Sequence, residues 1–425
     1  MIVRFGYVAM SVHIKNASPS KTMTATLFQT LADREAAIRK LERIAAENLH
    51  NTLRLLKHNK GEGIKLYRLS SKLIPLLTHE LLEGWDPLDA LEEDFRRLGD
   101  YAKTNGMRLS FHPDHFTVLS TPRQDVLEKS VKDLDWHVSM LERMGLDERY
   151  KCNIHIGGTY GNKEKAYLRF LEQFAAMPDR LRHRITLEND DKTFTAKETL
   201  EACKAVGVPM VLDVHHHAVN NEGVRIVELW EDIQRTWLAE KARVELSLRA
   251  AGAVDGETSG AEGAAAHHPE RVPVGVGAAA LSGVGAAGLA HAAAAAAPSS
   301  GAAGDTHAAT AAAPFGGAAA GLAHAATAAA PDATAPIAGE PTLTDELLAP
   351  KIHVSSPKSE KDPRGHANYV DSESFYAFLR EIAPMTPRLD VMIEAKMKDD
   401  ALFRLVEKIA AKPGVRRLGG AIVEL

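Results

Sequence analysis

Short segments with the composition of β-strands alternate with longer amphipathic segments along most of the chain. Eight such short segments precede or follow segments of helical periodicity. They cover residues 2–8, 64–69, 108–112, 153–157, 185–188, 210–214, 352–355 and 391–394. Eight strands that alternate with helices favour a (β/α)8 TIM-like barrel of the α/β class. A doubly wound open sheet is the alternative, because a count of strands does not prove closure.

The segments between the strands place apolar residues on one side of a helix. Residues 38–56 are the clearest case, with apolar side chains at every third or fourth position. Helix starts are expected at the Asp-Pro pair of residues 86–87 and the Thr-Pro pair of residues 121–122, since an N-cap residue followed by proline favours a first helical turn. Further helices are expected at residues 162–176, 195–206, 223–238, 372–383 and 399–412.

One segment, residues 250–343, interrupts this alternation. It consists largely of Ala, Gly, Pro and Thr, and it contains alanine tracts that end at Pro298, Pro314 and Pro331. With few large apolar side chains, it cannot offset the entropy lost on ordering. We therefore predict a disordered insertion between two parts of the barrel, residues 1–249 and 344–425. It lies between a helix and the next strand, hence on the barrel face opposite the active site. A spacer or partner-binding role is the alternative.

Histidine and carboxylate residues gather at the carboxyl ends of the predicted strands. In a TIM barrel these ends meet at one mouth. Carboxylates packed together there would repel each other and raise each other's pKa. Bound divalent cations would remove this repulsion. The mixed imidazole and carboxylate set suits Mn²⁺, Zn²⁺ or Fe²⁺ better than Ca²⁺. The candidates are His112, His155, Glu188, Asp213, one of the three histidines at residues 215–217, His353, His366 and Glu394.

Eight candidate ligands exceed what one ion needs and suggest two or three ions. Such a cluster suits phosphodiester hydrolysis, because metal ions activate water and neutralise phosphoryl oxygens. It equally suits sugar isomerisation, in which two ions polarise a carbonyl and a hydroxyl. The ligand chemistry alone does not separate these two reactions.

Composition and charge narrow the class of protein only slightly. The formal net charge of −5 is not that of a typical nucleic-acid binder, although residues 1–80 hold 13 Lys and Arg against 6 Asp and Glu. Two cysteines, Cys152 and Cys203, exclude a disulfide framework. The chain begins without a signal-peptide pattern and has no apolar run long enough to span a membrane. We expect a cytoplasmic protein.

The strand-end residues lie within strings that resemble the UV-damage endonucleases, relatives of the TIM-barrel abasic-site endonucleases and of the xylose-isomerase-like superfamily. The strings follow the family's order and cover the chain except for the alanine-rich segment. They are Phe5-Gly6-Tyr7, Ser110-Phe111-His112-Pro113, His155-Ile156-Gly157-Gly158, Leu187-Glu188-Asn189-Asp190, Asp213-Val214-His215-His216-His217-Ala218, Lys351-Ile352-His353-Val354-Ser355-Ser356, Gly365-His366-Ala367 and Ile393-Glu394-Ala395-Lys396.

The resemblance implies a ligand set and two catalytic residues. It selects His216 from its neighbours, places Glu188 at the centre as a possible bridge between two ions, and favours manganese. Lys351 is expected near the cluster, either as a carboxylated ligand or as an ammonium that contacts phosphate. The implied ligands are His112, His155, Glu188, Asp213, His216, His353, His366 and Glu394.

The resemblance also implies the reaction and the residues that sense damage. The expected reaction is incision of double-stranded DNA on the 5′ side of UV photoproducts, with abasic sites as secondary targets, and it leaves a 3′ hydroxyl. A monomer is the default expectation for the oligomeric state. Tyr7, His115 and Phe116 are expected to probe the duplex at positions where bases unstack. Where the family has a polar residue soon after Tyr7, this chain has Met10-Ser11. A sugar isomerase or epimerase of the same superfamily and a non-catalytic lesion-binding protein are the alternatives.

Deletion of residues 250–331 tests the passive character of the insertion. We expect nearly unchanged nuclease activity, because a helix-to-strand connection lies away from the mouth. Strand scission of one damaged duplex by the deletion variant and the full chain makes the comparison. A large loss of activity in a folded deletion variant would contradict the prediction.

Overall fold

Parallel strands form a closed barrel in the computed structural model, which describes residues 1–114, 116–257 and 341–425. Within these residues the barrel has eight strands: β1 (Ile2–Val8), β2 (Leu66–Arg68), β3 (Arg108–Ser110), β4 (Cys152–His155), β5 (Ile185–Glu188), β6 (Met210–Asp213), β7 (Lys351–Val354) and β10 (Arg388–Ile393). Each strand pairs in parallel with the next, and β10 returns to pair with β1. The bridge between Phe111 and Cys152 joins β3 to β4. The predicted (β/α)8 barrel is confirmed.

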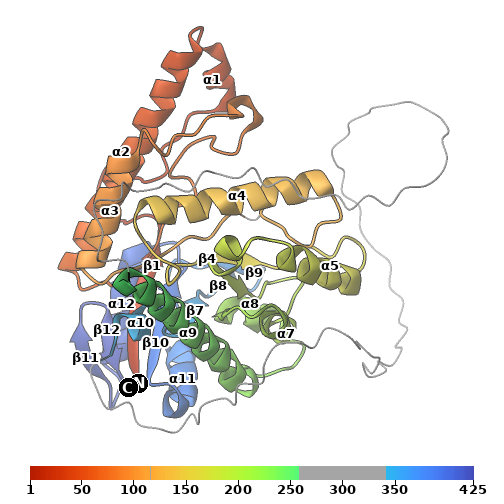
Figure 1. Cartoon of the computed structure of the whole chain (residues 1–425). Helices are drawn as coiled ribbons and strands as arrows, with labels where there is room; N and C mark the ends of the chain where they lie inside the picture. The colour runs from red at the N-terminus through yellow and green to blue at the C-terminus, as the bar shows by residue number, and fades with distance from the viewer. Residues whose placement is uncertain (115, 258–340) are drawn as a thin grey trace, which may run out of the picture. The chain divides into compact units, whose positions relative to one another are not determined.

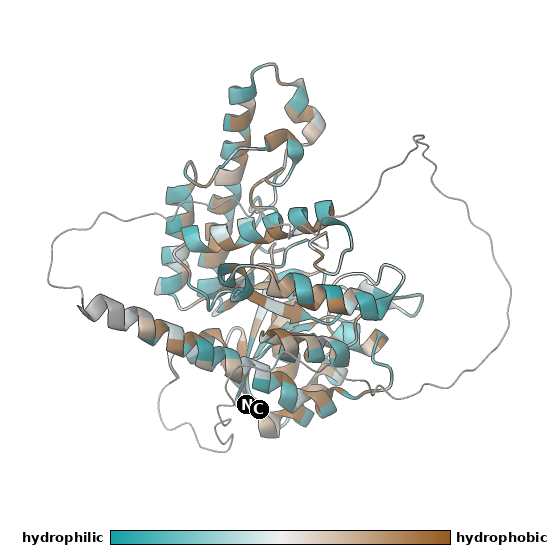
Figure 2. Ribbon diagram, turned by 45° about the vertical axis from the view of Figure 1, so that its right-hand side comes forward, coloured by the Kyte–Doolittle hydropathy of each residue, from teal (hydrophilic) through white to brown (hydrophobic). Residues whose placement is uncertain are grey.

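Helices surround the strands, and their polar residues colour much of the outer surface teal in Figure 2. The helices that follow the barrel strands agree with the predicted amphipathic segments. The described helices are α1 (Ala25–Thr30), α2 (Arg34–Gly61), α3 (Glu92–Thr104), α4 (Gln124–Arg143), α5 (Lys163–Ala175), α6 (Asp179–Arg182), α7 (Ala196–Val206), α8 (Val214–Val219), α9 (Ile226–Glu257), α10 (Leu343–Leu347), α11 (Ser372–Ile382) and α12 (Lys398–Ala410) (Figure 1). Two short 3₁₀ turns, η1 (Glu80–Leu82) and η2 (Ala383–Met385), complete them.

Local capping explains some helix starts and corrects two others. Thr195 and Glu198 form a capping box at the start of α7, which satisfies two backbone donors reciprocally. At the predicted start at residues 86–87, the Asp86 side chain accepts a hydrogen bond from the Leu88 amide and forms a turn, and α3 begins only at Glu92. At residues 121–122, Thr121 caps Arg123 in the same way, so α4 begins at Gln124. The predicted first helical residues, Pro87 and Pro122, were therefore early by five residues for α3 and by two residues for α4.

Strand alternation gives the barrel a charged floor beneath its mouth. On β1, Arg4 faces the barrel interior, where it pairs with Asp390 at 2.7 Å. Arg108 of β3 reaches the other oxygen of the same carboxylate, also at 2.7 Å. All three side chains are buried, and the mutual pairing offsets the cost of removing their charges from water. This ion-pair floor closes the barrel at the end away from the carboxyl ends of the strands.

Several elements were not predicted from the sequence. A two-stranded hairpin of β8 (Pro357–Ser359) and β9 (Asp362–His366) follows β7. A second hairpin, β11 (Arg416–Gly419) and β12 (Ile422–Glu424), adds β12 antiparallel to the first half of β1. Residues of α1, η1 and the first half of α2 form a separate small core, the α1–α2 lobe (Figure 1), around Met23, Phe28, Ala37, Leu41 and Leu82.

Only the two ends of the predicted insertion belong to the residues that the structure describes. Helix α9 continues to Glu257, past the boundary expected at residue 249, and α10 begins at Leu343 before β7. The predicted insertion otherwise lies outside the described residues. Among the helices of the described residues, none is long and apolar enough to cross a membrane.

The contact between α3 and α4 generates a stability prediction at Gly99. A Cβ atom at Gly99 would lie 1.7 Å from the carbonyl oxygen of Met144, whereas a Cβ at Gly61 would meet nothing within 4 Å. Gly99→Ala is expected to lower the free energy of unfolding by about 1–3 kcal/mol, because backbone must shift to relieve the overlap. Gly61→Ala, at the end of α2, is the control and is expected to be neutral or slightly stabilising. Urea denaturation of the three proteins measures both changes, and equal midpoints would refute the argument.

Candidate metal centre

The structure brings the predicted ligands to the mouth at the carboxyl ends of the strands. His155, Glu188 and Asp213 are the last residues of β4, β5 and β6. Glu394 follows β10 directly, and His112 lies two residues after the end of β3. His353 lies on β7, His216 on α8, and His366 ends β9. His112, His155, Glu188, His216, His366 and Glu394 line one cavity at this mouth.

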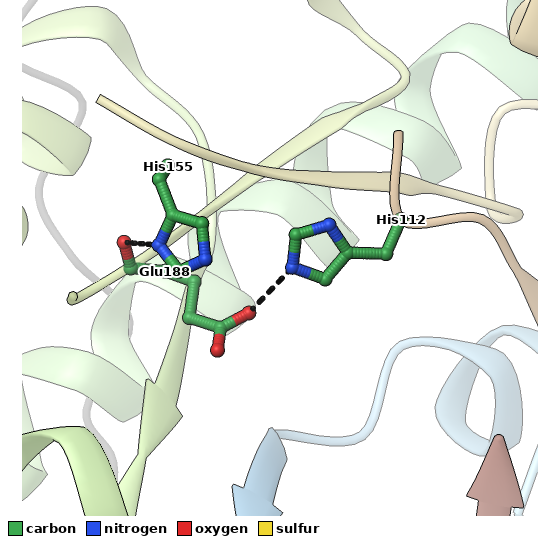
Figure 3. Close-up of side chains that lie close together, drawn as sticks. All are labelled: His112, His155 and Glu188. Atoms are coloured by element: carbon green, nitrogen blue, oxygen red, sulfur yellow. Dashed lines mark hydrogen bonds and ion pairs between the residues drawn. The ribbon is translucent and has the colours of Figure 1, made fainter. Parts of the chain in front are cut away.

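Among the described residues, three groups of ligand atoms are compact enough to hold an ion. In each group, one nitrogen or oxygen from every residue lies within 4.8 Å of the others. Glu188 belongs to all three groups, and Figure 3 shows it between His112 and His155. The groups are His112 with His155 and Glu188, Asp213 with His216 and Glu188, and His353 with Glu394 and Glu188. This arrangement fits the predicted central position of Glu188.

The Glu188 carboxylate lies among imidazoles rather than in water. It is 1% exposed. One oxygen is 3.0 Å from His353 Nδ1 and 3.3 Å from His112 Nε2, and the other is 3.6 Å from His216 Nδ1. Burial alone would raise the pKa of Glu188, but His353, His155 and His112 hold it well below its usual range. Glu188 is therefore an anion at neutral pH.

The other carboxylates have different electrostatic surroundings. Burial and the nearby Glu188 and Glu394 raise the pKa of Asp213, against the opposing effect of His216. Burial disfavours the charged form of His216, but Asp213 and Glu188 outweigh it and raise the pKa of His216 to about 9. The pKa of Glu394 stays well below its usual range, because Arg68 and His353 overcome its burial. The centre therefore brings together the buried carboxylates of Glu188 and Asp213 and the partly exposed carboxylate of Glu394.

Unpartnered buried atoms test whether these residues fit metal ions. Asp213 Oδ2 and both ring nitrogens of His353 are buried without a hydrogen-bond partner. His353 Nδ1 lies 3.0 Å from an oxygen of Glu188 and 3.0 Å from one of Glu394, but the direction of its N–H forms a hydrogen bond with neither. Buried polar atoms normally have partners. Atoms that converge without bonding each other are what a cation site requires, so the residues fit divalent metal ions.

Backbone carbonyls orient four of the imidazoles. A carbonyl oxygen can only accept, so each Nδ1 near one carries the proton and leaves Nε2 free to ligate a metal. The four contacts are His112 Nδ1 to Pro113 O at 3.0 Å, His155 Nδ1 to Glu188 O at 3.2 Å, His216 Nδ1 to Asn189 O at 3.0 Å, and His366 Nδ1 to Glu394 O at 2.9 Å.

The three consecutive histidines have different surroundings. Residues 215–217 belong to α8, so helical geometry directs their side chains. His215 contacts Ser355 Oγ at 2.6 Å and the Pro363 carbonyl at 2.7 Å. His217 Nε2 contacts the Val224 carbonyl at 2.9 Å. Of the three, His216 alone is placed in a ligand group of the described residues.

Three polar residues that sequence reasoning missed hold the ligands in place. Asn153 donates its amide N–H to Glu188, and Asn189 holds the backbone of Asp213 through two hydrogen bonds of 3.0 and 2.9 Å. Arg68 at the end of β2 forms an ion pair with Glu394. Asn153 stands two residues before His155 on the same strand, so its side chain points to the same side. The alternation of side chains along β4 was therefore the sequence feature that could have identified Asn153 as a neighbour of the ligands.

Lys351 lies one layer below the ligands. It precedes His353 by two residues on β7, is 2% exposed, and has Nζ 3.4 Å from Ser110 Oγ. Burial lowers the pKa of Lys351 to about 7, and Arg108 and Arg68 act in the same direction. The structure thus places Lys351 between the ligand layer and the ion-pair floor, where its amine has little access to solvent.

The predicted damage probes do not share one environment. Phe116 is 72% exposed in the loop after β3, and His115 lies outside the described residues. Tyr7 has no exposed surface, and its hydroxyl donates to Asn59 Oδ1 of α2 at 2.8 Å. The probing role of Tyr7 stays a prediction, and it would require the ring to leave this buried position. Arg4 faces the barrel interior, so strand alternation turns Tyr7 toward the helices. Ser11, in the position of the expected polar residue, donates its hydroxyl to Asp399.

The fold and the centre together define a class, the TIM-barrel proteins with an imidazole and carboxylate cluster at the mouth. Comparison with known proteins identifies the family within that class. The chain belongs to the UV-endonuclease UvdE family, whose model matches residues 3–274 and 324–425.

Named relatives agree with this assignment over the whole chain. The UV DNA damage endonuclease of Halalkalibacterium halodurans is 34% identical over 425 residues, which cover 100% of this chain and 99% of the relative. The protein of the same name from Bacillus pumilus is 32% identical, with the same coverage. The crystal structure of SacUVDE matches with a TM-score of 0.62 and 21% identity, covering 96% of each chain, and supports the fold.

Metal-induced stabilisation tests the ligand groups with a matched pair of variants. Mn²⁺ at about 100 times its dissociation constant is expected to stabilise the metal-free protein by about 2.7 kcal/mol. His216→Gln should lose most of this gain, because it removes a ligand from the group around Asp213. His217→Gln should retain the gain, since His217 bonds the Val224 carbonyl instead. Thermal unfolding of each protein with and without Mn²⁺ measures the shift, and equal shifts in both variants would reject the assignment of His216.

Proposed function

We propose that the protein is a DNA repair endonuclease that incises double-stranded DNA on the 5′ side of UV photoproducts and leaves a 3′ hydroxyl. Abasic sites are the proposed secondary substrate. The observation that carries the proposal is the buried Glu188 carboxylate shared by three ligand groups at a barrel mouth. The relatives named UV DNA damage endonucleases support the choice of substrate. Action on DNA would place the protein, as a monomer, with the nucleoid in the cytoplasm.

The proposed cofactors are two or three divalent ions, with Mn²⁺ favoured and Zn²⁺ or Fe²⁺ as alternatives. Such ions supply an activated water near neutral pH and charge neutralisation at phosphoryl oxygens. The residues proposed to hold them are His112, His155, Glu188, Asp213, His216, His353, His366 and Glu394. Glu188 would contribute to more than one ion, since it belongs to all three groups.

Basic residues of the chain around the mouth would hold the DNA backbone. Lys72 and Lys192 line the cavity, as does Arg68, which pairs with Glu394 at its edge. Lys361 is exposed on the turn between β8 and β9, at the opposite end of this hairpin from the predicted ligand His366. Contacts of this kind position a duplex without reading its sequence. We propose that Arg68 both orients Glu394 and faces the phosphate that enters the cavity.

Three of the predicted residues are proposed to act at the reacting strand. Lys351, buried below the ligands, is proposed as the second catalytic residue beside Glu188. Phe116, highly exposed on the loop after β3, is proposed to enter the duplex where a lesion weakens stacking. His115, its neighbour in the sequence, is proposed to assist.

Strand scission of a defined duplex tests the function directly. The substrate is an end-labelled duplex that carries one pyrimidine dimer, incubated with the protein and Mn²⁺. A single cut just 5′ of the dimer is expected, with no cut in EDTA or in the undamaged duplex. A folded, metal-loaded protein that leaves the damaged strand intact would overturn the proposed function.

The central role of Glu188 makes a sharper prediction in the same assay. Glu188→Gln is expected to abolish incision, because the neutral amide cannot balance the ions that the three groups would share. The fold should remain, since the amide retains the shape of the side chain; circular dichroism checks this. Glu222→Gln, an exposed change in the loop after α8, is the control and should cut normally. Near-normal cutting by Glu188→Gln would contradict the proposed role of Glu188 as the central metal ligand.

A further inference from the structure

The loop after β4 carries an exposed aromatic side chain close to the metal centre. Tyr160 follows the predicted ligand His155 by five residues and is 46% exposed. A Cβ atom at Gly158 would lie 3.6 Å from ring atom Cε2 of Tyr160, so the ring packs against this glycine. Gly157 and Gly158 line the cavity that contains the ligands. The Tyr160 ring therefore lies at the rim of the mouth.

The backbone at Tyr160 is strained. Its φ of +49° is in the left-handed region, which bulky side chains rarely adopt and which glycine adopts without cost. Burial does not explain the strain, because the side chain is half exposed. Strained residues of this kind gather at functional sites, where the surrounding structure holds them in place. We therefore infer that the tyrosine side chain has a functional role at this position, one that a glycine could not fill.

Neighbouring loops hold the ring rigidly. The guanidinium of Arg169 lies 5.8 Å from the centre of the Tyr160 ring, and its Nε donates to the Ser120 carbonyl at 3.0 Å. The hydroxyl of Ser120 in turn donates to the Gly158 carbonyl at 3.0 Å. Residues from the loops after β3 and β4 and from α5 thus fix one aromatic ring next to a fixed positive charge. A rigid ring loses little entropy when it binds a planar partner.

We propose that Tyr160 is a DNA-binding residue that stacks on a base displaced from the duplex at the lesion. Aromatic rings beside basic residues bind unstacked bases, because every base offers a π face. The bases of an intact duplex stack on each other and are not available to a rim residue, whereas a lesion lowers the cost of displacement. The proposal rests on the proposed DNA substrate. Tyr160 would thereby add a selectivity residue to those predicted from the sequence, on the loop that follows the predicted metal ligand His155.

Tyr160→Gly and Tyr160→Phe separate this role from a structural one. Tyr160→Gly removes the ring and also the backbone strain, so the thermal midpoint should stay equal or rise. We expect it to raise the half-saturating protein concentration on a dimer-containing duplex by about five- to a hundredfold. Single-turnover incision with Mn²⁺ measures this concentration together with the rate at saturation, which should change little. Tyr160→Phe should stay within about twofold of the wild type, because it keeps the aromatic face.

Two controls distinguish stacking from backbone binding and from strain relief. Binding to an undamaged duplex, measured by fluorescence anisotropy, should be the same for Tyr160→Gly and the wild type. Glu222→Gly changes another exposed residue with positive φ, +50°, and should leave half-saturation on the damaged duplex unchanged.

The outcomes separate this inference from the proposed function. If the wild type cuts the damaged duplex and Tyr160→Gly keeps its half-saturating concentration, the stacking role is wrong and the proposed function stands. Equal losses on damaged and undamaged duplexes, or a Phe variant as weak as the Gly variant, also overturn the stacking role. If the wild type neither binds nor cuts the damaged duplex, the proposed function fails and the inference fails with it.

Discussion

The Glu188 carboxylate is a buried anion whose charge is balanced by groups from several other strands. An isolated charge in the protein interior costs several kcal/mol, and pairing must offset this cost. Here His112, His216 and His353 approach the two oxygens within 3.6 Å, and Asn153 donates a hydrogen bond. These partners come from β3, β4, β7 and α8, so only a closed barrel can deliver them together. The requirement to balance Glu188 therefore links the chemistry of the mouth to the closure of the fold.

The barrel interior is organised in layers that separate stability from chemistry. The ion-pair floor of Arg4, Arg108 and Asp390 is self-compensated by short contacts. The ligand layer above it is not, since Asp213 and His353 retain buried atoms without partners. Lys351 lies between the two layers, and its depressed pKa reflects burial together with the cations around it. Unsatisfied atoms concentrate where ions would bind, while the layer that supports them is complete without any cofactor.

The rim of the mouth differs from its centre because loops rather than strands form it. Phe116 and Tyr160 are exposed there on the loops after β3 and β4, and the β8–β9 hairpin adds basic side chains after β7. Ser120 binds to the Gly158 carbonyl and to Arg169, so two rim loops are tied into one rigid unit. Rigid loops on a rigid barrel let exposed aromatic side chains act on a partner without first losing conformational entropy.

The sequence by itself determined the eight strands and the residues at their carboxyl ends, because hydrophobic periodicity and strand-end position are local properties of the chain. The closed barrel brought the predicted ligands together at one mouth as expected. Tertiary structure alone decided the direction of Tyr7, because the interior side of β1 depends on its pairing with β2 and β10. Local alternation did not decide which of residues 215–217 faces Glu188, since those residues form a helix; the resemblance to the family singled out His216, and the fold places it in a ligand group. The supporting roles of Arg68 and Asn153 were equally hidden, because each depends on a partner on another strand. Pairing across the barrel is a property of the folded chain, and no local pattern records it.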